Sequence, residues 1–153
     1  MWFSRKPAVR LPPQNAAGAA AAVPGQITTK SRGDAAEAAA RVFLVNAGLR
    51  WIESNYRTPG SGGGEIDLVM RAPDGTLVFV EVRHRSTATH GGAGASIGAA
   101  KQRRIILAAA HYLLRFASPP PCRFDVVLVQ GTLVGVKHFE PVLEWLPAAF
   151  DAS

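Results

Sequence analysis

The chain has 153 residues, of which 48% are hydrophobic, with a formal net charge of +6 and one cysteine. This length suits one domain with a tail, and a single cysteine excludes an internal disulfide and a cysteine-based zinc site. The apolar runs are short and broken by charge or glycine, so no segment of roughly 20 apolar residues could span a bilayer.

Residues 1–32 predict a disordered tail that is basic and rich in alanine and proline. They hold five Lys/Arg and no acid, whereas the rest of the chain has twelve bases against eleven acids. The weakly apolar stretch at 19–23 is short and closed by a Pro-Gly pair, which argues against a secretory signal. We therefore expect a cytoplasmic protein with its domain at 33–153.

The predicted elements of this domain belong to the α/β class. An alanine-rich helix over 33–47 meets Gly48 at its C′ position. The later elements are, in order, strands at 49–56, 64–70 and 76–83, a helix over about 95–116, strands at 124–129 and 132–138, and a short helix after Pro141. The order αβββαββα has a helical crossover after the third strand, which implies a parallel pair in a mixed central sheet flanked by helices.

The turn at 72–76 sets the register of a hairpin that carries acids. With the central Asp74 as pivot, residues whose numbers sum to 148 face each other, so Asp67 lies opposite Glu81 and Glu65 lies opposite Arg83. Because side chains alternate along a strand, these four share one face. That face continues into Val69, Leu77 and Phe79, while the opposite face holds Ile66, Leu68, Met70, Val78, Val80 and Val82.

Two carboxylates facing each other across a strand pair repel. A shared proton, a basic neighbour or a divalent cation would offset the repulsion, and Mg²⁺ suits two or three carboxylates with water and a substrate phosphate. In the competing interpretation, Asp67 and Glu81 are simply solvated and Glu65 pairs with Arg83 at the surface. The apolar neighbours of both acids argue against full solvation, and the spacing by itself leaves both interpretations open.

Four segments resemble a known family: 36–57 (AEAAARVFLVNAGLRWIESNYR), 64–69 (GEIDLV), 78–85 (VFVEVRHR) and 101–105 (KQRRI). They resemble the YraN-like family of bacterial predicted endonucleases in the PD-(D/E)XK nuclease superfamily, which is related in fold to archaeal Holliday-junction resolvases. The resemblance implies a restriction-endonuclease-like fold and a Mg²⁺- or Mn²⁺-dependent endonuclease acting on DNA, branched DNA included. Resolvase-type enzymes need two sites related by symmetry, which makes a homodimer one expectation.

The resemblance also assigns roles to individual residues. Asp67 and Glu81 would be metal ligands together with the carbonyl of Val82. Glu37 on the first helix would be an additional catalytic acid; alternatively, it is an acid favoured by the helix dipole. Glu65 would be either an acid behind the ligands or the partner of Arg83, and we favour the second role.

Arg83 departs from the family pattern, which has lysine at this third catalytic position. An arginine stays charged, so it can donate hydrogen bonds or neutralise a phosphate but cannot deprotonate water. Arg83 could thus stabilise the transition state of an active enzyme. It fits equally a nucleic-acid-binding module of the same fold that no longer cuts.

Residues 83–104 form a stripe with five bases and no acid, which indicates a polyanionic partner. The glycine-rich loop at 91–94 and the helix N-terminus after it would present free N–H groups to a phosphate. We expect DNA as the partner, contacted by Arg85, Lys101, Gln102 and Arg104; the alternatives are a merely solvated helix face or a protein-binding module. Lys101 could instead reach the carboxylate cluster, as basic residues on this helix do in related nucleases.

Overall fold

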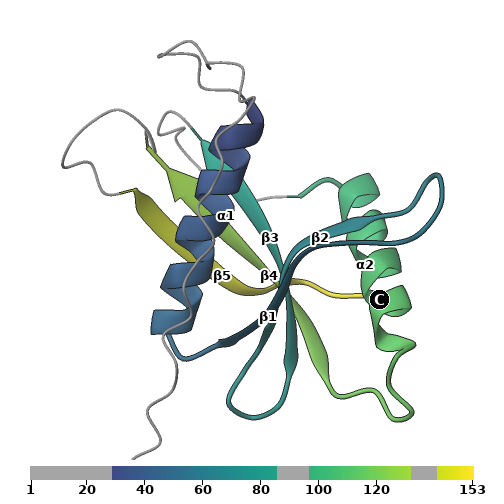
Figure 1. The fold of residues 1–153 in the computed structure, drawn as a ribbon. Coiled ribbons are helices and arrows are strands. Elements are labelled where there is room, and N and C mark those ends of the chain that lie inside the picture. Colours follow the sequence, from purple (N-terminus) through teal and green to yellow (C-terminus); the bar gives the residue numbers. More distant parts are fainter. Residues whose placement is uncertain (1–28, 86–96, 132–140) are drawn as a thin grey trace, which may run out of the picture.

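The computed structural model of the protein describes residues 29–85, 97–131 and 141–153. The elements are, in order, α1 (Thr29–Asn46), β1 (Arg50–Arg57), β2 (Glu65–Arg71), β3 (Leu77–Arg85), α2 (Ala99–Leu113), β4 (Cys122–Gln130) and β5 (Val142–Phe150) (Figure 1). Most of the expected tail, the glycine loop and the strand expected at 132–138 lie outside the described residues. Within them, no helix is long and apolar enough to cross a membrane.

The five strands form one sheet in the order β1-β2-β3-β4-β5. The β3–β4 pair is parallel and is connected through α2, whereas the other three pairs are antiparallel. The crossover and the mixed sheet expected from the sequence are therefore confirmed. The helices lie on opposite faces of the sheet, so the domain has three layers (Figure 1).

Each face of the sheet has its own hydrophobic core. On one face, Ala36, Ala40 and Leu44 recur at every fourth position of α1, which gives the helix a single buried stripe. They pack on Leu68, Met70, Val78, Val80, Val127 and Val129. On the other face, Ile105, Ala108, Ala109 and Tyr112 of α2 pack on Ile66, Val69, Leu77, Phe79, Phe124, Val126 and Leu128.

The predicted faces of the hairpin are correct with one exception. Ile66 was expected beside Leu68 on the α1 face, but it lies in the core under α2. The reason is a bend in the neighbouring strand, where Asn55 has a φ of +55° between the Ser54–Leu68 and Tyr56–Ile66 pairs. Asn tolerates this left-handed conformation better than most residues. Beyond the bend, β1 and β2 turn together toward α2 (Figure 1).

The bounds of both helices differ from the predicted ones. Helix α1 begins at Thr29 rather than at 33, so the last four residues assigned to the tail are helical. Its end was predicted correctly, because Gly48 has a φ of +106° and Leu49 donates a hydrogen bond to the carbonyl of Leu44. Helix α2 begins at Ala99 and ends at Leu113, a shorter span than the predicted one.

The helix expected after Pro141 is wrong, because Val142–Phe150 is strand β5. Strand β5 forms backbone hydrogen bonds with β4, which would otherwise be the edge strand of the sheet. The pairing shifts between Phe124 and Val126, and Ala148, opposite this irregularity, has a φ of +49°. A proline within a strand is tolerated at an edge or a bulge, and Pro147 lies at both. The described order is therefore αβββαββ.

Candidate metal centre at a fork in the sheet

The candidate site lies where β2 and β3 separate. Their pairing runs from Arg71–Leu77 to Leu68–Val80, and each pair has the predicted register. Beyond this point β2 stays paired with β1, and β3 stays paired with β4. The two halves of the sheet diverge as a fork, visible in Figure 1 as β1 and β2 swing toward α2. The two predicted acids, Asp67 and Glu81, lie just past the last pair.

Asp67 bridges this fork with its side chain. The Val82 backbone N–H donates a hydrogen bond of 2.8 Å to its Oδ2, and this N–H points to the side where the β2 ladder has already ended. Burial raises the pKa of the Asp67 carboxyl, although the Val82 hydrogen bond, an interaction with the Glu81 carboxyl and the charge of Lys101 act in the opposite direction. The Asp67 side chain of β2 thus accepts a hydrogen bond from the β3 backbone where the backbone pairing of the two strands has ended.

Glu81 is the more deeply buried acid, with 7% of its surface exposed. Its Oε1 lies 3.2 Å from Nζ of Lys101. Its Oε2 is buried and accepts no hydrogen bond from any described residue. Burial, followed by the negative charge of Asp67, raises the pKa of Glu81 to about 8 despite the nearby lysine. A buried carboxylate oxygen without a partner is costly, so a proton or a further positive group at this oxygen would be stabilising.

Lys101 completes the cluster from the first turn of α2. Its side chain is 52% exposed, so its ammonium group faces both Glu81 and solvent. The second placement considered for this residue, contact with the carboxylates, is therefore the one observed. Gln102, expected to bind nucleic acid, donates a hydrogen bond of 2.8 Å to the carbonyl of Ile97, in the segment before the helix.

Glu37 lies outside the cluster, on α1. Burial and then the charge of Asp67 raise the pKa of Glu37, while a hydrogen bond from the Asn55 side chain acts against the rise. The negative charge of Asp67 therefore acts on Glu37, although the two side chains belong to different elements. The described residues contain no group of three or more His, Cys, Asp or Glu that could hold a metal ion. Asp67 and Glu81 are the predicted ligands that the fold brings together.

Glu65 has a different partner from the one predicted. It forms an ion pair of 3.4 Å with Arg57 of β1. The fork explains the difference, since Glu65 remains paired with Arg57 on β1 while Arg83 continues beside Leu128 on β4. Opposition across the hairpin, assumed in the prediction, ends before these residues are reached.

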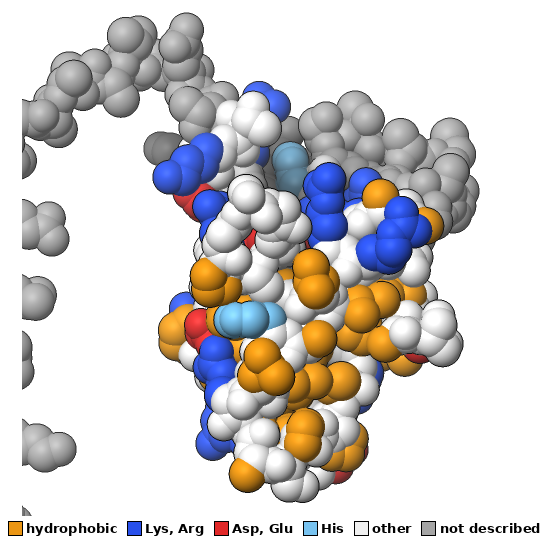
Figure 2. Space-filling view, turned by 90° about the vertical axis from the view of Figure 1, so that its right-hand side faces the viewer, with side chains coloured by type: hydrophobic (Ala, Val, Ile, Leu, Met, Phe, Trp, Pro, Cys, Tyr) orange, Lys and Arg blue, Asp and Glu red, His pale blue; other side chains and the backbone are white. Residues whose placement is uncertain are grey.

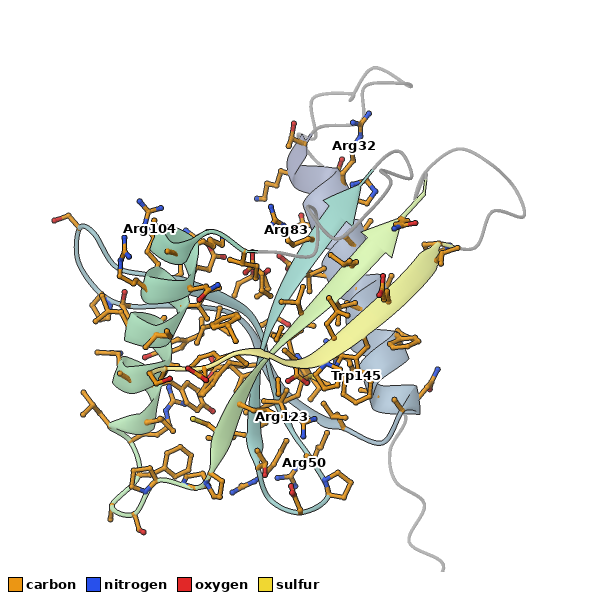
Figure 3. All side chains as sticks on the ribbon, turned by 180° about the vertical axis from the view of Figure 1, so that it is seen from behind. Arg32, Arg50, Arg83, Arg104, Arg123 and Trp145 are labelled. Atoms are coloured by element: carbon orange, nitrogen blue, oxygen red, sulfur yellow. The ribbon has the colours of Figure 1, made fainter. Side chains whose placement is uncertain are left out.

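The predicted basic residues gather at one end of the molecule. Figure 3 shows Arg83 at the end of β3, with Arg32 of α1 and Arg104 of α2 at the same end. Figure 2 looks onto the α2 face, where Lys and Arg side chains cluster above a hydrophobic area. The first turns of α2 contribute exposed Lys101, Arg103 and Arg104. Arg85 extends β3 as the backbone partner of Gln130.

Sequence reasoning missed Asn55 and Asp125. Asn55 creates the bend of β1 and hydrogen-bonds Glu37. Asp125 is fully buried, lies 3.1 Å from Nε of Arg123 and accepts hydrogen bonds from Trp145 and Ala148. A lone acid inside the apolar run 124–129 was a usable signal, because buried charges need partners.

Known proteins match this chain over most of its length. The family model described as uncharacterised protein family UPF0102 matches residues 36–129. A UPF0102 protein of Polaromonas naphthalenivorans (strain CJ2) is 76% identical over the full length of both chains, and one of Polaromonas sp. (strain JS666 / ATCC BAA-500) is 71% identical, also over both full lengths. A UPF0102 protein of Albidiferax ferrireducens is 61% identical over 82% of this chain and 91% of its own. The YraN-like resemblance is thus confirmed at the level of the family: the chain belongs to the uncharacterised protein family UPF0102.

Proposed function

We propose that the protein binds DNA and hydrolyses its phosphodiester bonds with a divalent cation held by Asp67 and Glu81. The observation that carries this proposal is the buried Oε2 of Glu81, which has no partner among the described residues. It lies at the fork with a second carboxylate, and each of the two acids has a raised pKa. A cation would offset both the missing partner and the repulsion between the acids.

The donor set fits Mg²⁺ or Mn²⁺. Mg²⁺ is usually held by one or two carboxylates together with waters and substrate phosphate, so the two acids suffice without a third side chain. In the nuclease pattern that the sequence resembles, the carbonyl of Val82 would be a further ligand. When bound, such an ion lowers the pKa of water and offsets negative charge on the phosphate.

Lys101 supplies the lysine that the family pattern expects at position 83. Its Nζ lies 3.2 Å from Glu81 Oε1 and half of its side chain remains exposed, so it can face the carboxylates and an incoming phosphate together. Its proposed task is to hold the attacking water and to stabilise negative charge as it develops. Arg83, a permanent cation, would neutralise the phosphate without exchanging a proton.

The basic end of the molecule supports DNA as the substrate. Arg32, Arg83 and Arg104 lie at this end (Figure 3), and Lys101 connects it to the acids. Cations on several elements around one site suit a phosphate backbone that passes over it. The mixed sheet with α1 before it and α2 as crossover is compatible with a restriction-endonuclease-like order, which is an argument by analogy.

The test is incubation of the protein with linear, nicked, flapped and four-way DNA in Mg²⁺ or Mn²⁺. We expect cutting that falls at least about a hundredfold in Asp67→Asn and Glu81→Gln, whereas Glu144→Gln, an exposed acid on β5, should match wild type. Calorimetry should show cation uptake by wild type. Equal uptake by Asp67→Ala would contradict the proposed site.

A second candidate function rests on Arg83. A domain with arginine at this position can bind DNA through the same surface without cutting it. The Arg83→Lys variant separates the two functions. If it cuts DNA that wild type only binds, the protein is a binding module derived from an enzyme. Cutting by wild type itself that is lost in Lys101→Met supports the enzyme.

A further inference from the structure

A hollow of about 470 Å³ opens between α1 and β1. Its walls carry two acids, Asp34 and Glu37, and one base, Arg41. Asn55 connects the hollow to the site, because it lines the hollow and lies between the Ser54–Leu68 and Tyr56–Ile66 pairs, opposite Asp67 on the neighbouring strand. A group held in the hollow therefore lies beside the strand pair that carries Asp67.

One wall of the hollow is a planar cation held in place by stacking. The guanidinium of Arg41 lies 3.5 Å above the centre of the Trp51 ring. The indole is itself fixed by a hydrogen bond of 3.0 Å from its N–H to the Ser54 hydroxyl. Guanidinium and aromatic planes are the surfaces on which proteins stack unpaired bases.

The rest of the lining suits a flat and neutral group. Val42 is 60% exposed and Ala38 is also exposed, so both offer apolar surface. The Asn55 amide and the Ser54 hydroxyl add neutral hydrogen-bonding groups. Two carboxylates against one guanidinium disfavour a phosphate. The volume falls in the range of small-molecule sites, so the lining fits a base and sugar better than an anion.

We propose that this hollow receives one unpaired nucleoside of the DNA strand whose phosphate lies at the fork. The inference rests on the proposed function and narrows its substrate to DNA with an unpaired nucleotide at the cleavage position. The base stacks on Arg41, and the carboxylates of Asp34 and Glu37 accept hydrogen bonds from it. Ionised carboxylates only accept, so bases with an exocyclic amino group are favoured over thymine. A paired base stays within the duplex stack and cannot enter.

The experiment measures binding without divalent cation, so that no strand is cut. Fluorescence anisotropy compares a short paired duplex with the same duplex carrying one unpaired adenosine, one unpaired thymidine or one unpaired abasic unit. We expect the adenosine bulge to bind about tenfold tighter than the duplex, a difference of about 1.4 kcal/mol. The thymidine and abasic bulges should lose most of that gain.

Two variants place the effect in the hollow. Ala38→Trp fills it from an exposed position of α1, and Arg41→Ala removes the stacking wall. Both should abolish the preference for the adenosine bulge and leave duplex affinity unchanged. The matched controls Ala110→Trp and Arg50→Ala, both at exposed positions outside the hollow, should keep the preference.

The outcomes separate this inference from the proposed function. Salt-dependent duplex binding with no gain from the bulge overturns the hollow as a nucleoside site and leaves the proposed function intact. Absence of salt-dependent binding to every probe overturns both. Displacement of the bulged duplex by an equal concentration of free deoxyadenosine monophosphate would show a mononucleotide site and overturn the assignment to a DNA strand.

Discussion

At the scale of single residues, the proposed chemistry depends on three side chains from three elements. Asp67 of β2, Glu81 of β3 and Lys101 of α2 meet at the fork. The lysine offsets part of the repulsion between the acids, and Oε2 of Glu81 remains without a partner among the described residues. Such a cluster should respond to pH, to cations and to single substitutions in predictable directions.

The stability of the cation-free protein should fall as pH rises from 4.5 to about 8, because the folded state raises the pKa of Glu81 over that range and therefore binds the proton more tightly than the unfolded chain. Glu81→Gln stays neutral, so it should remove most of the decline. At a pH of about 9 it should be more stable than wild type by a few kcal/mol, since each pKa unit corresponds to about 1.4 kcal/mol. Denaturant unfolding at several pH values measures this.

Added Mg²⁺ supplies the control for that experiment. A bound cation favours the ionised carboxylate, so it should flatten the pH dependence of wild type and leave Glu81→Gln unchanged. A wild-type unfolding free energy that is constant across this pH range without cation would contradict the raised pKa of Glu81.

Lys101 should matter for turnover more than for binding. Replacing it with methionine keeps the unbranched apolar stem but removes the charge 3.2 Å from Glu81. We expect kcat to fall about a hundredfold with a small change in KM, because the charge acts mainly on the transition state. Arg103→Met, an exposed neighbour on α2, is the matched control. Equal losses in the two variants would reduce Lys101 to a general DNA contact.

At the scale of elements, the site depends on how the β1–β2 hairpin and β5 are anchored. The hairpin packs on α2 through Gly64, where a Cβ atom would lie 1.9 Å from the carbonyl oxygen of Arg104. Strand β5 is held through Asp125, which receives hydrogen bonds from Trp145 and Ala148. The first contact holds the strand of Asp67 against the helix of Lys101, and the second holds β5 beside β4.

Gly64→Ala should destabilise the protein by roughly 2–4 kcal/mol, because backbone on both sides must shift. Gly33→Ala is the matched control with the opposite sign. It lies in α1 with nothing within 4 Å of a new Cβ, so it should stabilise by up to about 1 kcal/mol. Thermal unfolding of the two variants checks both signs; a Gly64→Ala protein as stable as wild type would contradict the close packing of the hairpin on α2.

Asp125→Ala should cost about 3–5 kcal/mol, because it leaves the partly buried Arg123 without its carboxylate and two N–H donors without an acceptor. Loss of a distant acid should leave cation affinity per folded molecule unchanged. Unfolding by denaturant together with calorimetry at low temperature separates the two effects. A cation affinity that falls with stability would place Asp125 in the functional site.

At the scale of the whole molecule, the sequence predicted the order and pairing of the central strands better than it predicted the C-terminal strand and the contacts beyond the hairpin. The turn at 72–76 predicted the hairpin register, and alternation along 65–71 and 77–85 supported it, since a slip of one residue would move Asp67 to the same face as Val80 and Val82. The β5 strand was missed because Pro141 and Pro147 suggested a helix start and interrupted the strand pattern. The Glu65–Arg57 pair was missed because the separation of β2 from β3 comes from sheet bending, which a pairwise pattern does not contain.

The distribution of charge over the molecule predicts how the proposed DNA binding should respond to salt. Arg104 lies at the end that carries Arg32 and Arg83, whereas Arg50 lies at the opposite end (Figure 3). Arg104→Ala should weaken binding to every DNA sequence and reduce the slope of log affinity against log salt by about 1. Arg50→Ala should leave the slope unchanged. The reverse pattern would move the DNA to the other end of the molecule.

The parallel β3–β4 pair also affects the order in which the parts of the candidate site come together during folding. The three strands before it form a local meander that can pair as soon as it is synthesised, whereas β4 must wait until the chain segment containing α2 has closed a long loop. Lys101 lies on that segment. We therefore expect a nascent chain to carry its acids without their counter-charge, and the competent site to be among the last parts of the domain to mature.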